Sequence, residues 1–369
     1  NWDGKIKFVS EYKVFIMKGI ILHGGHGTRL RPLTHTGPKQ LLPIANKPMS
    51  EYCIDAIKSA GICEIAIIIG GIGSEKVKEY YGTGEKFGVK ISYIEQDLPR
   101  GIAHAINLCK DFVKNEKFLV FLGDNIINKN ILDFTEKFKK SDDDASILLC
   151  EVDNPSRFGI ANMKGKKIIE IMEKPKNPPT NLAVTGIYFL TPLIFEIIKD
   201  LKPSWRNELE ITDALDQLLK MNKKISYHII TDYWKDTGTP EDIIHANRVI
   251  LEKMKLFNEG EKEIDVIISG NVMIGKNTKI KSGTEIIGPV IIGENCIIES
   301  NAKIGPNASI GDNSFVSKAT ISDSIIMADC KINAHINIKN SIIAFNSSIT
   351  SNKNVEKIFL VGEGTKINL

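Results

Sequence analysis

The sequence lacks a long apolar run and has little excess of either charge. No apolar run approaches the roughly 20 residues that a membrane-spanning helix needs, so we expect no membrane partner. Lys and Arg number 48 against 45 Asp and Glu, a formal charge of +3, which is far from the basic excess typical of nucleic-acid-binding proteins. We therefore expect no nucleic-acid partner either, and any anionic ligand must be met by local lysines and arginines.

The cysteines form no C-x-x-C pair, which indicates neither a zinc site nor a disulfide framework. Six are scattered along the chain: Cys53, Cys63, Cys109, Cys150, Cys296 and Cys330. Residues 1–16 lack the uninterrupted apolar core of a signal peptide, and we expect them to be an upstream extension before a natural start at Met17. Reduced thiols without a signal peptide predict a cytoplasmic protein.

A chain of 369 residues suggests two domains, since domains commonly span about 100 to 200 residues. Over residues 17–248, short apolar runs alternate with amphipathic ones. The runs predict strands at 18–22, 64–70, 90–96 and 117–124, and helices at 50–61, 73–82 and 101–113. This alternation predicts an α/β domain with a mostly parallel sheet, whose ligands gather at the carboxyl ends of its strands.

After a charged helical connector at residues 249–263, the pattern changes to a six-residue rhythm. Ile-Gly pairs begin at positions 274, 292, 304 and 310, so the gaps of 18, 12 and 6 are all multiples of six. Other apolar residues add to the rhythm: Val272, Ile280, Ile286, Ile298, Ile321, Ile332 and Ile338. A hexapeptide repeat predicts a parallel β-helix over residues 264–369, and it resembles the left-handed β-helices of sugar-nucleotide enzymes and acyltransferases.

Three glycines, Gly24, Gly25 and Gly27, follow the first expected strand in the stretch LHGGHGTRLRPLT. The stretch is not a Walker A motif, and the third glycine of a dinucleotide fingerprint would fall on Leu30. What remains is a glycine loop whose backbone N–H groups can cradle phosphates, with Arg29 placed to neutralise them. A tight turn with solvated arginines is the alternative that these residues alone leave open.

A family resemblance decides between these alternatives. GGHGTRLRPLT followed by PKQLLPIANKPM resembles the nucleoside-triphosphate sugar-1-phosphate nucleotidyltransferases, and most closely the long-form glucose-1-phosphate thymidylyltransferases. The remaining motifs in family order are EQDLPRGIAHA, FLGDNI, RFGIA, IMEKPKNP, TGIYFL, ELEITDAL and WKDTGTPED. The resemblance covers residues 17 to about 248 and implies a Rossmann-like domain with a mixed sheet. It also implies a homo-oligomer that makes dTDP-glucose and pyrophosphate from dTTP and glucose-1-phosphate.

The expected reaction needs cations more than it needs a base. The sugar phosphate attacks the α-phosphate, and a phosphate monoester with a second pKa near 6 is already ionised at neutral pH. The resemblance assigns Mg²⁺ to Asp124 and Asp236, which follow apolar segments, and Mg²⁺ is typically held by one or two carboxylates plus phosphates. It places Arg29 at the β- and γ-phosphates, Lys39 at the transferring phosphate and Lys174 at the sugar phosphate. The alternative for the two aspartates is that each caps a loop. The alternative for the arginine and the two lysines is that they are solvated surface side chains.

The resemblance also assigns the residues that contact the base and the sugar. The expected nucleotide-binding residues are Leu22, Gly24, Gly25, Gly27, Thr28, Gln40, Gln96 and Gly101. Within this set the two glutamines and the backbone of Gly101 would read the pyrimidine. The expected hexose-binding residues are Phe158, Gly159, Glu173, Val184 and Tyr188. Trp234 either packs beside the sugar or belongs to the core.

Two departures and two rival functions complete the expectations. The family usually has alanine at His23 and glycine at Asn207. His23 and His26 would make a poor metal pair because no acidic third ligand accompanies them.

One rival function is that of a bifunctional uridylyltransferase whose tail acetylates an amino-sugar phosphate. Its general base would be His335, the one histidine after His245. The other is a non-catalytic nucleotide-binding subunit, which would be expected to lose Lys39, Asp124 or Asp236.

Overall fold

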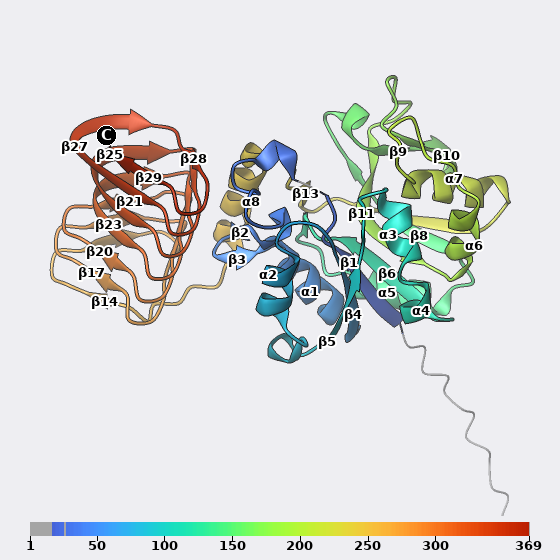
Figure 1. Ribbon diagram of the computed structural model, residues 1–369, viewed down its shortest axis with the longest axis horizontal. Coiled ribbons are helices and arrows are strands. Elements are labelled where there is room, and N and C mark those ends of the chain that lie inside the picture. The colour runs from blue at the N-terminus through green and yellow to red at the C-terminus, as the bar shows by residue number, and fades with distance from the viewer. Residues whose placement is uncertain (1–16, 26, 369) are drawn as a thin grey trace, which may run out of the picture.

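A computed structural model describes residues 17–25 and 27–368 of the chain. An N-terminal α/β part and a C-terminal stack of short strands, called the tail below, lie at opposite ends of an elongated molecule, with helix α8 (Pro240–Lys253) facing the tail (Figure 1). The expectations for residues 1–16 and for His26 lie outside the described residues.

The sheet of the N-terminal part is mixed. Its order is β10-β9-β11-β6-β1-β4-β5, with β8 beside β11 and β12 beside β8. The strands are β1 Met17–Leu22, β4 Glu64–Ile69, β5 Lys90–Glu95, β6 Lys117–Leu122, β8 Ala145–Glu151, β9 Gly159–Lys164, β10 Lys167–Glu173, β11 Leu182–Leu190 and β12 Ile225–Ile230. The four strands expected from the sequence are confirmed as β1, β4, β5 and β6, and they pair in parallel.

The expectation of a mostly parallel sheet is wrong, because antiparallel pairs are as numerous as parallel ones. Strand β11 runs antiparallel to β6, β8 and β9, and β9 runs antiparallel to β10. For β9 and β10 the reason is local, because only Gly165 and Lys166 separate them and so short a connection joins antiparallel strands. The other antiparallel pairs arise because β11 inserts between β6, β8 and β9.

Helices cover both faces of this sheet because successive side chains of a strand point to opposite faces. Ile20 is buried in a cluster with side chains of α3, α4, α6 and α7, whereas Ile21 is buried with side chains of α1, α2 and α5. These helices are α1 Met49–Ser59, α2 Ser74–Tyr81, α3 Ile102–Asn107, α4 Lys110–Val113, α5 Leu132–Lys140, α6 Leu193–Lys199 and α7 Ile211–Lys220. The single helix expected at 101–113 is two helices, because the Cys109 N–H turns to the carbonyl of Ile106, three residues back.

The tail consists of short parallel strands stacked at a regular interval. Val272 pairs with Val290 and Ile280 with Ile298, so the first strands of the tail meet the strand three hexapeptides further on. Later strands depart from this interval, as where Ser309 pairs with Ile325, 16 residues on. All seven of the apolar residues that carry the expected rhythm are buried in one interior cluster. The strands are β14 Glu261–Lys262, β15 Ile267–Ser269, β16 Val272–Ile274, β17 Lys279–Ile280, β18 Glu285–Ile287, β19 Val290–Ile292, β20 Ile297–Ile298, β21 Lys303–Ile304, β22 Ala308–Ile310, β23 Phe315–Ser322, β24 Ile325–Ile326, β25 Lys331–Lys339, β26 Ile342–Ile343, β27 Ser348–Lys357, β28 Leu360–Val361 and β29 Lys366–Asn368.

Helix α8 connects the two parts. It begins with a capping box, in which the Thr239 side chain accepts from the Asp242 N–H and the Asp242 carboxylate accepts from the Thr239 N–H. The expected connector, residues 249–263, begins inside this helix, which continues to Lys253. Near its other end lies β14, which pairs with β17 of the tail, so both ends of the connector belong to regular structure. A buried apolar cluster that includes Leu33, Ile243 and Met327 joins the two parts.

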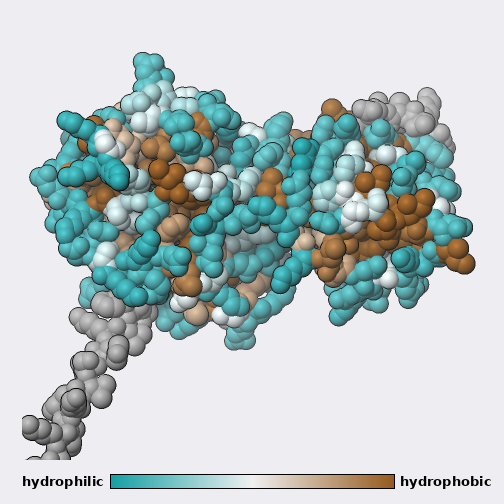
Figure 2. All heavy atoms as spheres, turned by 180° about the vertical axis from the view of Figure 1, so that it is seen from behind, coloured by the Kyte–Doolittle hydropathy of each residue, from teal (hydrophilic) through white to brown (hydrophobic). Residues whose placement is uncertain are grey.

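The tail also carries apolar side chains on its outside. Seen from behind, they gather on one of its faces (Figure 2). Its strongly exposed apolar residues include Ile264 and Ile267, which are 83% and 62% exposed. A search of the described helices finds none long and apolar enough to cross a membrane.

Candidate active site

Two adjoining cavities lie at the carboxyl edge of the mixed sheet. Their volumes are about 560 Å³ and 280 Å³, and both are lined by Leu122, at the end of β6, and by Asp124 just beyond it. The smaller cavity is also lined by Leu22, at the end of β1. The cavities therefore occupy the place where ligands of open α/β sheets bind.

The smaller cavity brings together most of the expected nucleotide-binding residues. It is lined by Leu22, Gly24, Gly25, Gln40, Gln96 and Gly101, and also by Lys39. The Gln40 amide donates to the carbonyl of Gly24 (3.1 Å), while its buried Oε1 has no hydrogen-bond partner among the described residues. Because an unpaired buried acceptor is costly, a ligand N–H donor at this oxygen would be favoured.

The other residues of the nucleotide set have different surroundings. The Gln96 amide nitrogen lies 2.9 Å from His104 Nδ1. Gly101 has a φ of +107°, and a Cβ there would lie 2.4 Å from the carbonyl oxygen of Leu209, so this position requires glycine. Gly27 and Thr28 are not among the residues that line either cavity; they form the start of the short helix η1 (Thr28–Leu30).

The larger cavity brings together the expected sugar-binding residues and, with Asp124, four of the expected charged groups. It is lined by Phe158, Gly159, Glu173, Lys174, Val184, Tyr188, Arg29 and Asp236. The Glu173 carboxylate accepts from Thr212 Oγ1 (3.0 Å). Burial raises the pKa of Glu173, and the nearby Lys174 ammonium offsets part of this rise. A buried carboxyl group in a polar cavity is suited to hydrogen-bonding hydroxyl groups.

Trp234 belongs to the core, as one of the two alternatives left by the sequence has it, and it also borders the larger cavity. Its Nε1 donates to Asn125 Oδ1 (2.8 Å), and its ring meets Phe158 edge-on with centroids 5.7 Å apart. The tryptophan therefore fixes Asn125 and one wall of the cavity at the same time.

Asp124 lies where the two cavities meet and is paired with Lys39. The lysine Nζ donates to Asp124 Oδ2, and Asn125 Nδ2 donates to Oδ1 (3.0 Å). Burial alone would raise the pKa of Asp124, but the charge and hydrogen bond of Lys39 and the hydrogen bond of Asn125 hold it below its usual value. Asp124 is thus a carboxylate beside a cation at the centre of the site.

Asp236 is brought to the same place by a two-stranded sheet. Strand β7 (Asn125–Ile127) pairs with β13 (Trp234–Asp236), which sets Asp236 opposite Asn125. Burial and then the negative charge of Asp124 raise the pKa of Asp236. Two carboxylates that repel each other across one cavity fit a divalent cation, and a search of the described residues found no cluster of three His, Cys, Asp or Glu ligands. The pair would leave the remaining coordination positions to substrate phosphates.

The sequence expectations missed Arg206, which lines both cavities. Its guanidinium contacts the carboxylates of Glu208 and Glu210 at 3.1 Å each and lies 3.5 Å from Glu173. The stretch RNELE was noted only for Asn207, whose φ of 60° explains why glycine is common there. A long-range pairing of Arg206 with Glu173, 33 residues away, has no local sequence pattern.

Comparison with known proteins agrees with this geometry. Residues 18–253 match the nucleotidyl transferase family, and residues 286–369 match the GMPPB C-terminal domain. The chain belongs to the nucleotidyl transferase family, and within it to the sugar-1-phosphate nucleotidyltransferases. Members of this family use a nucleoside triphosphate and a sugar-1-phosphate as substrates and generally use a divalent metal ion.

Particular relatives differ in what their names describe. The low-salt glycan biosynthesis nucleotidyltransferase Agl11 of Haloferax volcanii is 46% identical over 71% of this chain and 73% of its own length. A glucose-1-phosphate thymidylyltransferase of Streptomyces antibioticus is 40% identical over 72% of this chain and 74% of its own length. A solved Bacillus anthracis structure described as a glucose-1-phosphate thymidylyltransferase is 43% identical, with a TM-score of 0.60, and covers 63% of this chain and 94% of that chain.

Proposed function

We propose that this nucleotidyltransferase transfers the thymidylyl group of dTTP to glucose-1-phosphate and forms dTDP-glucose and pyrophosphate. The observation that carries the proposal is the pair of cavities that meet at Asp124, the partner of Lys39, with amide side chains in one cavity and Glu173 with Tyr188 in the other. The similarity to the Streptomyces thymidylyltransferase supports dTTP and glucose-1-phosphate as the substrates.

The reaction needs positioning and charge stabilisation, and no general base. An oxygen of the sugar phosphate forms a bond to the α-phosphorus while the bond from that phosphorus to the bridging oxygen of pyrophosphate breaks, and the leaving group takes the electron pair. The nucleophile is already ionised at neutral pH. Lys39 would hold the transferring phosphate, Arg29 the β- and γ-phosphates and Lys174 the phosphate of the sugar, so that two anions approach within a cationic frame.

Asp124 and Asp236 would hold Mg²⁺. When bound, the ion supplies charge neutralisation for the α-phosphate and the departing pyrophosphate. The raised pKa of Asp236 next to Asp124 supports this role, because repulsion between the two carboxylates is what a cation relieves. The residues themselves orient the site, with Asn125 and Thr237 hydrogen-bonded to Asp124.

Base and sugar would be held by hydrogen bonds from opposite ends of the site. Gln40 and Gln96, together with the backbone of Gly101, would pair with the pyrimidine edge, and the unpartnered Oε1 of Gln40 supports this assignment. Leu22, Gly24 and Gly25 would lie along the nucleotide. In the larger cavity Glu173 and Tyr188 would contact sugar hydroxyl groups, with Gly159 and Val184 leaving room for the ring.

We further infer that the tail is a left-handed β-helix of hexapeptide repeats. The parallel pairing, which in the first coils falls at intervals of three hexapeptides, and the single apolar interior support this architecture. The homo-oligomer expected from the sequence is a prediction that light scattering on the full chain would test.

The second candidate is the bifunctional uridylyltransferase for an amino-sugar phosphate that the sequence left open, and similarity to a bifunctional protein keeps it as the alternative. The bifunctional protein GlmU of Methanococcus maripaludis is 38% identical over 72% of this chain and 62% of its own length. The acetyltransferase role considered for His335 finds no support in the geometry, since that side chain is exposed on β25 and lines neither cavity of the site.

The decisive experiment is pyrophosphate release with Mg²⁺, in which dTTP, UTP, ATP, CTP and GTP are each paired with glucose-1-phosphate, N-acetylglucosamine-1-phosphate and mannose-1-phosphate. Consumption of acetyl-CoA on glucosamine-1-phosphate is measured beside it. We expect the highest kcat/KM for dTTP with glucose-1-phosphate and no acetyl-CoA consumption. A preference for UTP with the amino sugar would replace this proposal by the second candidate.

Three substitutions test the assigned chemistry. We expect Lys39→Ala, Asp124→Asn and Asp236→Asn each to lower kcat by at least about a hundredfold, because each removes a charge that acts on the transferring group. Asp133→Asn, which changes an exposed carboxylate on α5, is the matched control and should keep the wild-type rate. Wild-type rates in all three site variants, with circular dichroism unchanged, would contradict the mechanism.

A further inference from the structure

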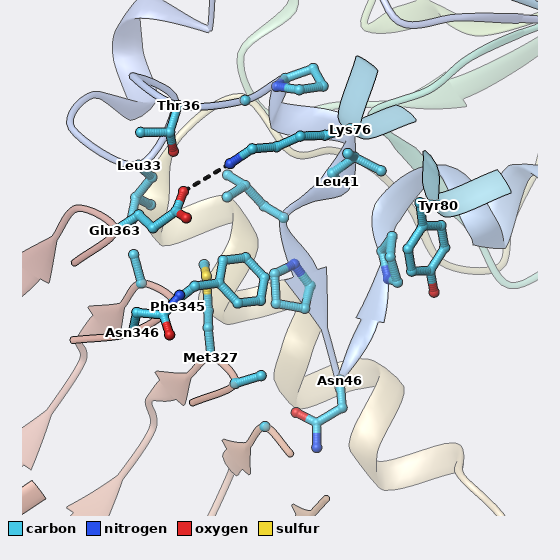
Figure 3. A pocket seen from close by; sticks show the side chains of 18 of the residues that line it. Leu33, Thr36, Leu41, Asn46, Lys76, Tyr80, Met327, Phe345, Asn346 and Glu363 are labelled. Carbon is cyan, nitrogen blue, oxygen red and sulfur yellow. Dashed lines mark hydrogen bonds and ion pairs between the residues drawn. The ribbon is translucent and has the colours of Figure 1, made fainter. Parts of the chain in front are cut away.

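A cavity of about 740 Å³ lies between the tail and the segment that follows Lys39 and Gln40 (Figure 3). Leu41, Leu42 and Pro43 line it on one side, and Met327 and Phe345 of the tail line it on the other. Side chains that border a cavity have fewer packing partners on that side. The segment that carries Lys39 and Gln40 therefore packs against the tail only in part, through Leu42 in the buried cluster with Met327.

The same segment is held at its far end. The short helix η2 (Lys39–Leu41) leads directly into a hairpin of β2 (Pro43–Ile44) and β3 (Lys47–Pro48), whose tip is Ala45 and Asn46. The Ala45 N–H donates to Asn247 Oδ1 in α8 (2.8 Å), and Asn46 Nδ2 donates to the carbonyl of Ile310 in the tail (2.7 Å). Both tip residues have positive φ angles, 48° and 62°, so the tip has a defined and unusual backbone.

Asn247 joins three parts of the molecule. Its side chain is 1% exposed, and its Oδ1 also accepts from Ser309 Oγ of the tail (2.6 Å). Around it, Ala45 packs in a buried cluster with Leu251 of α8 and Met273 and Ile291 of the tail. Hydrogen bonds in such a buried network are stronger than at the surface, and their loss leaves unsatisfied groups.

We propose that Asn46 and Asn247 are positioning residues through which the tail sets the placement of Lys39 and Gln40 in the nucleotide cavity. The inference rests on the proposed roles of Lys39 and Gln40. Ala45 follows Gln40 by five residues, so a tip fixed to α8 and the tail limits how far η2 can move along the cavity wall. The tail then contributes to nucleotide binding although none of its described residues lines either cavity of the site.

The chain offers a matched control next to Asn247. Arg248 also bridges α8 to the tail, through Asp323 (Nη2 to Oδ1, 2.7 Å), but this ion pair does not involve the hairpin. The variants are therefore Asn46→Gly, which keeps the left-handed backbone and removes the amide, Asn247→Ala, and Arg248→Gln as control. The first two should raise the KM for the nucleoside triphosphate by about tenfold and lower kcat, because small displacements of binding groups are expensive.

Comparing the KM for the nucleoside triphosphate with the KM for the sugar phosphate distinguishes a positioning role from a simple loss of stability. In Asn46→Gly and Asn247→Ala the KM for the sugar phosphate should stay within about twofold of wild type, and Arg248→Gln should change neither KM. Hydrogen exchange of the Leu41 and Leu42 amides, which donate to Pro38 and Lys39, should speed up in the first two variants alone. Equal exchange and unchanged nucleotide KM in all three would overturn the inference.

The two readouts separate this inference from the proposed function. A wild-type protein that releases no pyrophosphate from any substrate pair contradicts the proposed function, while the exchange rates still decide whether the tail holds η2. If the wild type is active, and Asn46→Gly and Asn247→Ala match Arg248→Gln in both the nucleotide KM and hydrogen exchange, the result contradicts this inference and leaves the proposed function standing.

Discussion

Replacing His23 by alanine should reduce the amount by which the free energy of unfolding of this protein decreases on acidification. His23 is 2% exposed and stands directly after β1, where it meets the ring of Tyr81 edge-on, and neither ring nitrogen has a hydrogen-bond partner among the described residues. Burial lowers the pKa of His23 from 6.5 to about 3, although the charge of Asp124 acts in the opposite direction. The unfolded chain therefore binds a proton at a higher pH than the folded chain.

The sign and size follow from this difference. A histidine whose pKa is depressed by folding stabilises the native state fully above pH 6.5, its value in the unfolded chain, and progressively less as the pH falls below it. Between about pH 7 and about pH 5, the unfolded chain takes up nearly one proton at this site while the folded chain takes up almost none. The free energy of unfolding should fall by about 2 kcal/mol over that interval because of His23 alone.

Urea unfolding followed by tryptophan fluorescence measures this contribution. Wild type, His23→Ala and His335→Gln, which removes an exposed histidine, are unfolded at both pH values in buffer with a chelator. The alanine variant will be less stable at neutral pH because a cavity replaces the ring, so the comparison uses only the change with pH. That change should be about 2 kcal/mol smaller in His23→Ala than in the other two proteins. Equal changes in all three would mean that the folded protein accepts the proton on His23.

Two further predictions concern the capping of α8 and the pH dependence of sugar binding. Thr239→Ala removes the capping box of α8 and should lower the free energy of unfolding by about 1 kcal/mol, measured by urea titration, without changing kcat. Since burial raises the pKa of Glu173, its carboxylate form is lost at a higher pH than for an ordinary glutamate. On acidification, the KM for the sugar phosphate should therefore begin to rise at a higher pH than an ordinary glutamate would cause. Glu173→Gln should remove this part of the pH dependence of the KM. The same pH dependence in Glu173→Gln as in wild type would contradict the assignment.

The sequence predicted features that depend on short segments. Strands such as β1 and β6 are runs of consecutive apolar residues, so their pattern reveals them, and the polar residues just beyond their ends fall at the edge where ligands bind. The buried residues of the tail could be predicted equally well, because apolar residues that recur every six positions mark one side of a repeating unit. Gln40 and Gln96 were found through motifs, and the structure places both in the smaller cavity.

The features that the sequence did not predict depend on contacts between distant segments. The antiparallel half of the sheet follows from where β11 inserts, and nothing in its residues indicates that β6 and β8 will be its neighbours. Arg206 becomes part of the site only because the chain folds back onto Glu173. The junction of hairpin, α8 and tail depends on Asn247, an amide with ordinary neighbours in the sequence.

The same distinction bears on nucleotide selectivity. Thymine and uracil present the same hydrogen-bonding edge, so amides such as Gln40 and Gln96 cannot tell them apart. Discrimination must come from apolar contact with one methyl group, which is worth only about 1 to 3 kcal/mol in a pocket. The smaller cavity has apolar side chains for such a contact, among them Pro99, Ile102 and Leu122. Pro99 and Ile102 come from one segment, and Leu122, at the end of β6, meets them only in the fold. Motifs therefore identify nucleotidyl transfer, while we expect the choice of base to depend on how these apolar side chains pack.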